Sequence, residues 1–437
     1  MANIITAVQK GLGKQSFAEI VGLTTDVVHN LGTKLIEEIV SALDEQYNAS
    51  RDRHAVIMRN NKSRRMLTQM GEVTLSRRLY YDKHKEKYFF AVDELLDIER
   101  RSRIDTGLKQ DLIRHATLTS YGKASEIAGH KVSRQTVHNI VKMLPQERVK
   151  AKVQGYKTVK AIFIEADEDH IHLNNGRSAE VKLVYVHEGT KQVCKGRTEL
   201  ISPKYFTSVK NNDEEIWSEV FEYVYNQYKV NKAEIHISGD GAQWIKNGLE
   251  YFPKARYHLD KFHVYKSITD ISGADKAMRR AVIKALMTED FDSIRKLYTI
   301  RHQNAVKARE RKNIASGLFY IENNFDEIDL SKTYSCAAEG HVSHILSARL
   351  SSRPMGWSRD GAGRMAKLRA YYFNGGDFAV LVGGRSKPAK TVAQSNKICY
   401  NTIHRTNEIS ETVSARIVGL DGITNGLSVL LRSTLKN

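Results

Sequence analysis

The sequence predicts a mixed α/β protein with a mainly helical region ahead of a sheet-containing domain. Between about residues 160 and 259, short runs rich in β-branched residues alternate with amphipathic helical patterns. Two of these runs, 162–169 and 235–241, end abruptly in carboxylates, although the chain carries a net charge of +18. Because an unpaired buried charge is strongly disfavoured, the acidic strand ends indicate a divalent-metal site in a protein that binds a polyanion.

Composition limits the partners and the compartment. The 437 residues allow two to four domains, and 68 Lys and Arg against 50 Asp and Glu favour nucleic acid over an anionic membrane surface. No apolar run approaches the roughly 18 residues of a spanning helix, and no secretory signal is expected. Three distant cysteines, Cys194, Cys336 and Cys399, give no disulfide framework and no paired-thiolate zinc motif. We therefore expect a reducing interior, the bacterial cytoplasm, with a nucleus as the alternative.

The first hundred residues divide into two predicted segments. Residues 1–50 have apolar side chains at helical spacing, among them Val28, Leu31 and Leu35, and are expected to be helical without an assignable function. Residues 51–104 form a basic segment in which 72–75 and 87–92 are the strands of a β-hairpin around a charged loop.

Residues 105–148 are predicted to form a helix-turn-helix. A short helix from Tyr121 to Ala128 is followed by a turn at Gly129 and by a second helix with Ser133 as its N-cap. A helical hairpin inside a core is the alternative. In the DNA-binding interpretation, the outward face of the second helix contacts bases and phosphates through Arg134, Gln135, His138, Asn139 and Lys142.

Residues 155–380 form the predicted catalytic domain. Its expected order is β-β-β-α-β-α-β, which is the order of an RNase H-like domain, and a helical insertion at about 265–330 follows it. Residues 385–437 are expected to be a basic tail. The strands are expected near 160–166, 181–187, 191–199, 234–239 and 255–259, with helices at 217–228 and 242–250.

Three acids are the candidate metal ligands, because Mg²⁺ prefers carboxylate oxygens gathered from separate elements. Asp167 ends the first strand, with Glu165 and Asp169 as competitors, and all three are solvated loop acids in the alternative interpretation. Asp240 lies between two glycines that permit a tight turn, unless it is a plain turn residue or helix cap. Glu339, among small residues, is the third candidate.

Further acids and bases surround this set. Glu322, Asp326 and Glu327 are the alternatives to Glu339, which alone would be a surface acid. Asp260 and His263 share a helix face and are auxiliary to the site or a structural pair.

The basic stretch 349–369 carries further candidate DNA-binding residues. In the functional interpretation they contact a strand end or a flipped base, and in the alternative they are a solvated basic face. The residues are Arg353, Trp357 and Arg364.

Five motifs together resemble a known family. They are Ile-Glu-Ala-Asp-Glu-Asp-His at 164–170, Ser-Gly-Asp-Gly-Ala at 238–242, His-Leu-Asp-Lys-Phe-His at 258–263, Glu-Gly-His-Val-Ser-His at 339–344 and Arg-Pro-Met-Gly-Trp-Ser at 353–358. The chain resembles bacterial insertion-sequence transposases of the RNase H-like DDE class, in the family related to Mutator-type transposases and once catalogued only as uncharacterised.

The resemblance implies a function and its residues. Asp167, Asp240 and Glu339 would bind two Mg²⁺, with Mn²⁺ as a possible substitute, and Asp260 with His263 would match the Asp-x-x-His signature of the relatives. The protein would bind double-stranded DNA at inverted-repeat ends and at the target, cleave and join it, and act as a homo-oligomer at the nucleoid, without a membrane. A non-catalytic DNA-binding regulator and an RNase H-like nuclease are the alternative functions.

Overall fold

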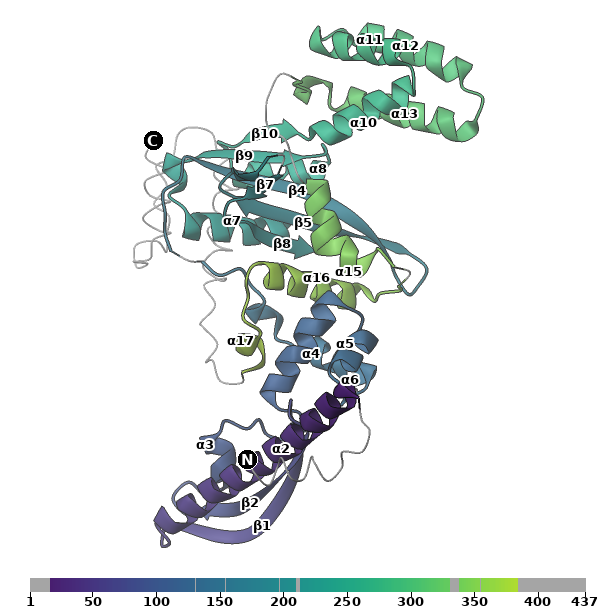
Figure 1. Cartoon of the computed structure of the whole chain (residues 1–437). Coiled ribbons are helices and arrows are strands. Elements are labelled where there is room, and N and C mark those ends of the chain that lie inside the picture. Colours follow the sequence, from purple (N-terminus) through teal and green to yellow (C-terminus); the bar gives the residue numbers. More distant parts are fainter. Residues whose placement is uncertain are drawn as a thin grey trace, which may run out of the picture. The chain divides into compact units, whose positions relative to one another are not determined.

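The chain is described by a computed structural model that covers residues 16–383, with gaps at 130, 154, 196, 210–212, 331–337 and 354. These residues divide into two compact units, 16–148 with 377–383 and 149–376 (Figure 1). The predicted basic tail, residues 385–437, lies outside the described residues. The class is mixed α/β, as predicted.

The first unit contains a three-stranded antiparallel sheet beside a long helix. The strands β1 (Val56–Leu67), β2 (Glu72–Asp82) and β3 (Lys87–Phe90) lie in the order β1-β2-β3, followed by the short helix α3 (Ala91–Leu95). The sequence predicted two of these strands and missed β1, because its run of basic and polar residues, largely exposed, hides the strand pattern.

The helix α2 (Phe17–Ser50) begins at a capping box between Ser16 and Glu19 and covers an edge of β2. Glu37 accepts a hydrogen bond from the backbone N–H of Thr74 at 2.5 Å, and Asp44 accepts one from that of Arg78 at 3.3 Å. β3 pairs only with residues 79–82 of β2, so these bonds satisfy backbone donors of the central strand where it has no second strand partner.

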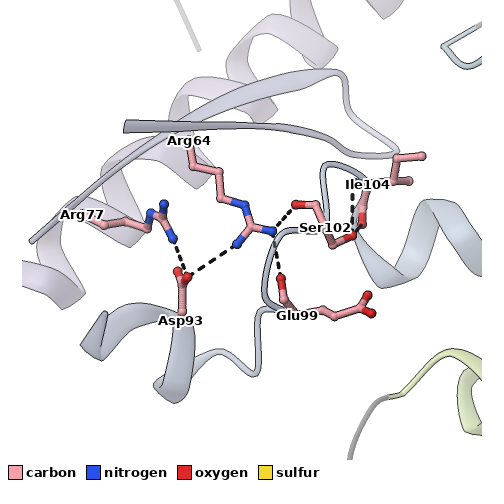
Figure 2. Close-up of polar contacts among 6 residues, drawn as sticks. All are labelled: Arg64, Arg77, Asp93, Glu99, Ser102 and Ile104. Carbon is pink, nitrogen blue, oxygen red and sulfur yellow. Dashed lines mark hydrogen bonds and ion pairs between the residues drawn. The ribbon is translucent and has the colours of Figure 1, made fainter. Parts of the chain in front are cut away.

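A buried ion-pair network connects the sheet to the segment that follows it (Figure 2). The Asp93 carboxylate, on α3, pairs with Arg77 and lies 3.5 Å from Arg64 Nη1. The other terminal nitrogen of Arg64 donates to the carbonyl oxygens of Glu99, at 2.8 Å, and of Ser102. Two strands, α3 and the loop before α4 are thus held by one pair of arginines.

Three helices complete the first unit. They are α4 (Thr106–Leu118), α5 (Tyr121–Ile127) and α6 (Arg134–Lys142), and each contacts the other two. The turn η1 (Gln146–Arg148) follows α6, and α17 (Phe378–Val382) packs on α4.

The second unit is built on a five-stranded mixed sheet in the order β10-β9-β4-β5-β8. The central strand β4 (Ala161–His172) is parallel to β9 (Glu234–Gly239), which is parallel to β10 (Arg256–Leu259). The strands β5 (Ser178–His187) and β8 (Lys204–Ser208) pair antiparallel on the other side of β4.

One strand of the predicted order was wrong. Residues 191–199 do not join the main sheet but form a separate exposed hairpin of β6 (Thr190–Cys194) and β7 (Arg197–Leu200). The third strand of the sheet is β8, which is buried at all five positions. The alternation of charged and uncharged residues at 191–199 is typical of a half-buried strand, which led to the wrong prediction. The polar residues Lys204 and Ser208 are not typical of a buried strand, so β8 was not predicted.

The two faces of this sheet differ in chemistry. Alternate residues of β4, such as Ile162, Ile164 and Ala166, join Val184 and Trp217 in an apolar core under α7 (Glu214–Gln227). This core extends over α8 (Gln243–Lys246) and α9 (Gly248–Tyr251), with η2 (Val230–Lys232) before β9. The opposite, polar face meets α14 (Ala338–Val342), the π-helical turn η4 (Ser343–Ser347) and α16 (Arg359–Phe373), with α15 (Ala348–Leu350) between them.

A helical insertion lies between β10 and α14. It comprises α10 (Lys261–Ser272), α11 (Lys276–Met287), α12 (Phe291–Asn304), α13 (Ala308–Asn323) and the turn η3 (Phe325–Glu327), drawn in green in Figure 1. These helices share an apolar cluster of their own, which includes Ile268, Val282, Ile294 and Ile321. Among the described residues, no helix is long and apolar enough to cross a membrane.

Candidate functional site

Three carboxylates form a row where the parallel pairing of the strands ends. Asp167 lies within β4, which continues to His172, so the prediction that it ends the strand was wrong. Glu165 of β4 pairs with Ser238 of β9, so two residues further on Asp167 comes beside Asp240. Leu259 of β10 pairs with Gly239, and the Asp260 N–H donates to the Gly239 carbonyl at 2.7 Å. Residues in register on parallel strands point to the same face. The chain therefore brings Asp167, Asp240 and Asp260 to one edge of the sheet.

Asp167 is partly buried and electrostatically coupled to its neighbours. Burial raises the pKa of its carboxyl to about 6, against the opposing effects of the Glu168 N–H, which donates to Asp167 Oδ1 at 2.8 Å, and of His263. The negative charges of Asp240 and Asp260 raise this pKa further. A cation placed beside such a carboxyl would favour its charged form.

The competing acids of β4 are engaged elsewhere. Glu165 is 5% exposed, accepts a hydrogen bond from the Tyr185 hydroxyl and lies 3.1 Å from His187 Nε2. Asp169 accepts a hydrogen bond from Ser351 Oγ at 2.8 Å. Of the three acids weighed from the sequence, Asp167 is therefore the best placed to bind a ligand.

Both glycines around Asp240 are required, Gly239 by close packing and Gly241 also by its backbone conformation. A side chain at Gly239 would meet Ile245 and, at 3.1 Å, the Ala166 carbonyl of the neighbouring strand. Gly241 has a φ of +98°, and a side chain there would overlap Asn324. Asp240 itself accepts from the Ala242 N–H at 2.9 Å. Asp240 is therefore a turn residue, as its alternative interpretation from the sequence proposed, and it also lies beside Asp167.

Asp260 and His263 share the first turn of α10, as predicted. Asp260 is 3% exposed and caps the helix by accepting from the Phe262 N–H at 3.0 Å. His263 Nε2 lies 3.8 Å from its other oxygen. Burial raises the pKa of Asp260 despite this N–H and His263, and Glu165 and Glu339 raise it further.

Glu339 lies on α14, which contacts β4 on the polar face. Its side chain is exposed, and its charge acts on Asp260, so it faces the same end of the sheet as the carboxylate row. The alternatives are less available, because Glu322 pairs with Arg295, at 2.5 Å, and Glu327 with Lys246, at 2.8 Å. Asp326 lies in the turn η3.

These acids are not drawn together tightly. Over residues 16–383, leaving out the gaps, no three His, Cys, Asp or Glu side chains are grouped closely enough to hold a metal ion. Like charges repel when no cation lies between them. The donor set itself, several carboxylate oxygens on separate elements around one strand end, has the chemistry that Mg²⁺ and Mn²⁺ require. The residues therefore fit such an ion by type.

An aromatic network that the sequence did not reveal joins α14 to the polar face. His341, two residues after Glu339, packs against the Tyr185 ring at 4.6 Å, and its Nδ1 lies 3.2 Å from the Tyr205 hydroxyl. Tyr185 in turn donates to Glu165. His341 belongs to the motif at 339–344. Nothing in the sequence distinguished Tyr185 or Tyr205, because tyrosines in strands are usually core residues.

The exposed face of α6 is the second candidate surface. Ser133 caps the helix by accepting from the Thr136 N–H at 3.2 Å, which confirms the predicted N-cap, while Val137 and Val141 are buried. His138 is half-buried against Tyr121, with ring centres 5.5 Å apart. The exposed side chains are Arg134, Gln135, Asn139 and Lys142.

Only some side chains of the basic stretch before α16 are exposed. Trp357 is 7% exposed, donates to the Leu350 carbonyl at 3.0 Å and carries the Arg349 guanidinium over its ring at 4.9 Å. A buried ring cannot stack on a base, so the prediction for Trp357 was wrong. Arg364 pairs with Asp360 at 2.9 Å, and Arg353 is exposed.

Comparison with known proteins identifies the family. The profile of an uncharacterised protein family, UPF0236, matches residues 12–383. The chain belongs to UPF0236. The match extends over both units and includes Asp167, Asp240, Asp260 and Glu339.

Several UPF0236 proteins are similar over most of their length. One from Caldanaerobacter subterraneus subsp. tengcongensis, whose name joins eleven gene loci of that genome, is 35% identical over 85% of this chain and 81% of its own length. A second from the same organism is 35% identical over 85% and 82%. A third, named for its place in the vanSb 3′ region of Streptococcus gallolyticus, is 24% identical over 72% and 73%.

Proposed function

We propose that this UPF0236 protein is a DNA transposase of the RNase H-like DDE class. It would bind the terminal inverted repeats of its insertion sequence and catalyse metal-dependent strand cleavage and strand transfer. The observation that carries the proposal is the row of Asp167, Asp240 and Asp260 across three parallel strands, with Glu339 on a helix over the same face. Acids so placed in a chain of net charge +18 suit a phosphodiester substrate.

Asp167, Asp240 and Glu339 would hold two Mg²⁺, or Mn²⁺ in their place. Bound there, such ions activate an attacking oxygen and stabilise a leaving one in phosphodiester displacement. The protein supplies the rest. Asp260, fixed as the N-cap of α10, holds His263 beside Asp167, and the contact of His341 with Tyr185 sets the position of the helix that carries Glu339.

DNA recognition is assigned to the first unit. We interpret α5 and α6 as a helix-turn-helix in which Arg134 and Lys142 contact phosphates while Gln135 and Asn139 contact base edges. His138 would act by packing on Tyr121. Arg353 and Arg364 are proposed to contact DNA near the catalytic domain.

The relatives favour a mobile element over a regulator. A relative whose name covers eleven loci in one genome has the copy number that transposition produces and that a single-copy regulator does not need. We extend the proposal to action at the nucleoid of the bacterial cytoplasm. A structure-selective nuclease on the same fold is the second candidate, because fold alone does not set the substrate.

The test is a cleavage and joining reaction. Purified protein is incubated with DNA carrying the ends of its own element in Mg²⁺, and nicks and joined products are separated on denaturing gels. We expect cuts at the element ends, none with Asp240→Asn, and an undiminished rate with Glu234→Gln, an exposed acid at the opposite end of the same strand. Undiminished cutting by Asp240→Asn contradicts the proposal, and equal cutting of an arbitrary RNA–DNA hybrid favours the nuclease.

A further inference from the structure

The helix α2 has two apolar faces, of which the described residues of its own unit cover only one. The covered face includes Val40, which lies in the cluster with Met66, Val73 and Val92. Further along it, the Tyr47 ring packs on Tyr80 with centres 5.1 Å apart. This face accounts for the attachment of α2 to the sheet.

The second face is exposed along most of the helix. At 100° per residue, its six residues fall within an arc of about 80°. Phe17 is 80% exposed, and the other five are between 49% and 54% exposed. We call this set the α2 stripe: Phe17, Val21, Val28, Leu31, Leu35 and Ile39.

The stripe is too long and too regular to be a scatter of surface apolar residues. From Phe17 to Ile39 it runs for about 33 Å at 1.5 Å per residue. Isolated exposed apolar side chains are normal, whereas a contiguous patch along one line marks an interaction site.

The spacing within the stripe identifies the kind of partner. Steps of four and three residues lead from Phe17 through Val21, Thr24, Val28 and Leu31 to Leu35. This is the heptad alternation of a coiled coil, with Val21, Val28 and Leu35 at the a positions. A heptad line is complementary to another helix with the same repeat, and Val at two of the three a positions with Leu31 at d suits a two-stranded pair.

Charge and area also match a second copy. Of the positions flanking this line, Ile20, Thr25, Val27 and Gly32 are uncharged. The flanking cation Lys34 would face Ile39 of the second copy in a parallel pair, so like charges are not opposed there. The stripe offers on the order of 500 Å² of apolar surface, and the flanking residues bring each copy toward the roughly 800 Å² of a standard interface.

We propose that α2 pairs with α2 of a second copy of this chain in a parallel two-stranded coiled coil along the α2 stripe. The inference rests on the geometry of one helix and holds whether or not the protein cuts DNA. Joined to the proposed function, it gives the dimer two catalytic units, one for each end of an element.

The first test measures mass in solution by light scattering after gel filtration. We expect the full chain at tens of micromolar to have twice the mass of one 49.6 kDa copy. The double variant Leu31→Glu/Leu35→Glu should weaken dimerisation on the order of 100-fold or more and run as a monomer. Its circular dichroism should stay unchanged, because both side chains are exposed and Glu favours helix. Leu23→Glu, an exposed apolar residue on a different face of α2, is the matched control and should remain a dimer.

The second test fixes the orientation. In a cysteine-free background, Val21→Cys and Leu35→Cys should each form a disulfide with the same position of the second copy. Cross-links only between Val21→Cys and Leu35→Cys would overturn the parallel arrangement. A monomeric wild type, a dimer unaffected by the double glutamate variant, or a cross-link of the stripe to residues 1–15 of the same chain would overturn the pairing itself. None of these outcomes depends on DNA cleavage, so failure here is distinct from failure of the proposed function.

Discussion

The substitution Asp167→Asn should stabilise the second unit in the absence of divalent metal. Burial raises the pKa of Asp167 from 3.8 to about 6, so the folded protein binds this proton more tightly than the unfolded chain. The stability contribution is therefore fully present below about pH 4 and is lost as the pH rises through about 6. At about 1.36 kcal/mol per pKa unit the cost at neutral pH is at most about 3 kcal/mol, and partial exposure reduces it to about 1–3 kcal/mol.

Urea unfolding followed by tryptophan fluorescence measures this effect. The three tryptophans, Trp217, Trp244 and Trp357, all lie in the second unit, so their emission reports its unfolding. With a chelator at pH 7.5, Asp167→Asn should be more stable than wild type by about 1–3 kcal/mol, and this advantage should shrink toward pH 4.5. Added Mg²⁺ should stabilise wild type more than the variant.

The control is Asp169→Asn, two residues further along the same face. Asp169 accepts a hydrogen bond from Ser351, so this variant should not gain stability. A variant Asp167→Asn that is less stable than wild type at pH 7.5 without metal, or that gains as much from Mg²⁺ as wild type does, would refute the reasoning.

Three further outcomes are expected. Gly241→Ala should lose Mg²⁺-dependent stabilisation, because the φ of +98° at Gly241 and the adjacent Asn324 exclude a side chain. The control Gly340→Ala should fold normally, because no atom lies within 4 Å of the added Cβ, and thermal melts with and without Mg²⁺ distinguish the two variants. Asp93→Ala should destabilise the first unit by about 3–5 kcal/mol, since it leaves the buried Arg77 unpaired. Arg65→Ala, at the exposed pair with Glu72, should cost less than about 1 kcal/mol. Near-equal losses of stability in urea unfolding would contradict this. Arg134→Ala and Lys142→Ala should each lower the slope of log affinity for end DNA against log salt by about 0.9; an unchanged slope removes α6 from the interface.

Regular patterns made most of the second unit predictable. The strand at 234–239 was predicted to the residue, and Ser133 and Asp260 cap their helices as their local chemistry requires. These features depend on neighbours within a few positions, which a sequence displays directly.

Features that depend on distant partners were missed. The all-buried strand β8 contains Lys204, whose ammonium reaches the Asn374 carbonyl at 2.9 Å, a partner 170 positions away. Trp357 resembled a DNA contact because its basic neighbours are visible in sequence, while its hydrogen bond to Leu350 is not. The contact between Tyr185 and His341 joins a strand to a helix more than 150 residues later. In the sequence, nothing distinguished Lys204 or Tyr185 from ordinary surface or core residues.

The central claim is that Asp167, Asp240 and Glu339 bind the same divalent ions, and metal-directed cleavage of the protein tests it most directly. Fe²⁺ is added in place of Mg²⁺ in the presence of end DNA, and ascorbate with peroxide generates hydroxyl radicals that cut the backbone beside the metal. The account predicts fragments ending near residues 167, 240, 260 and 339, all lost in Asp240→Asn. Cuts elsewhere in the chain, or cuts that persist in that variant, would contradict it.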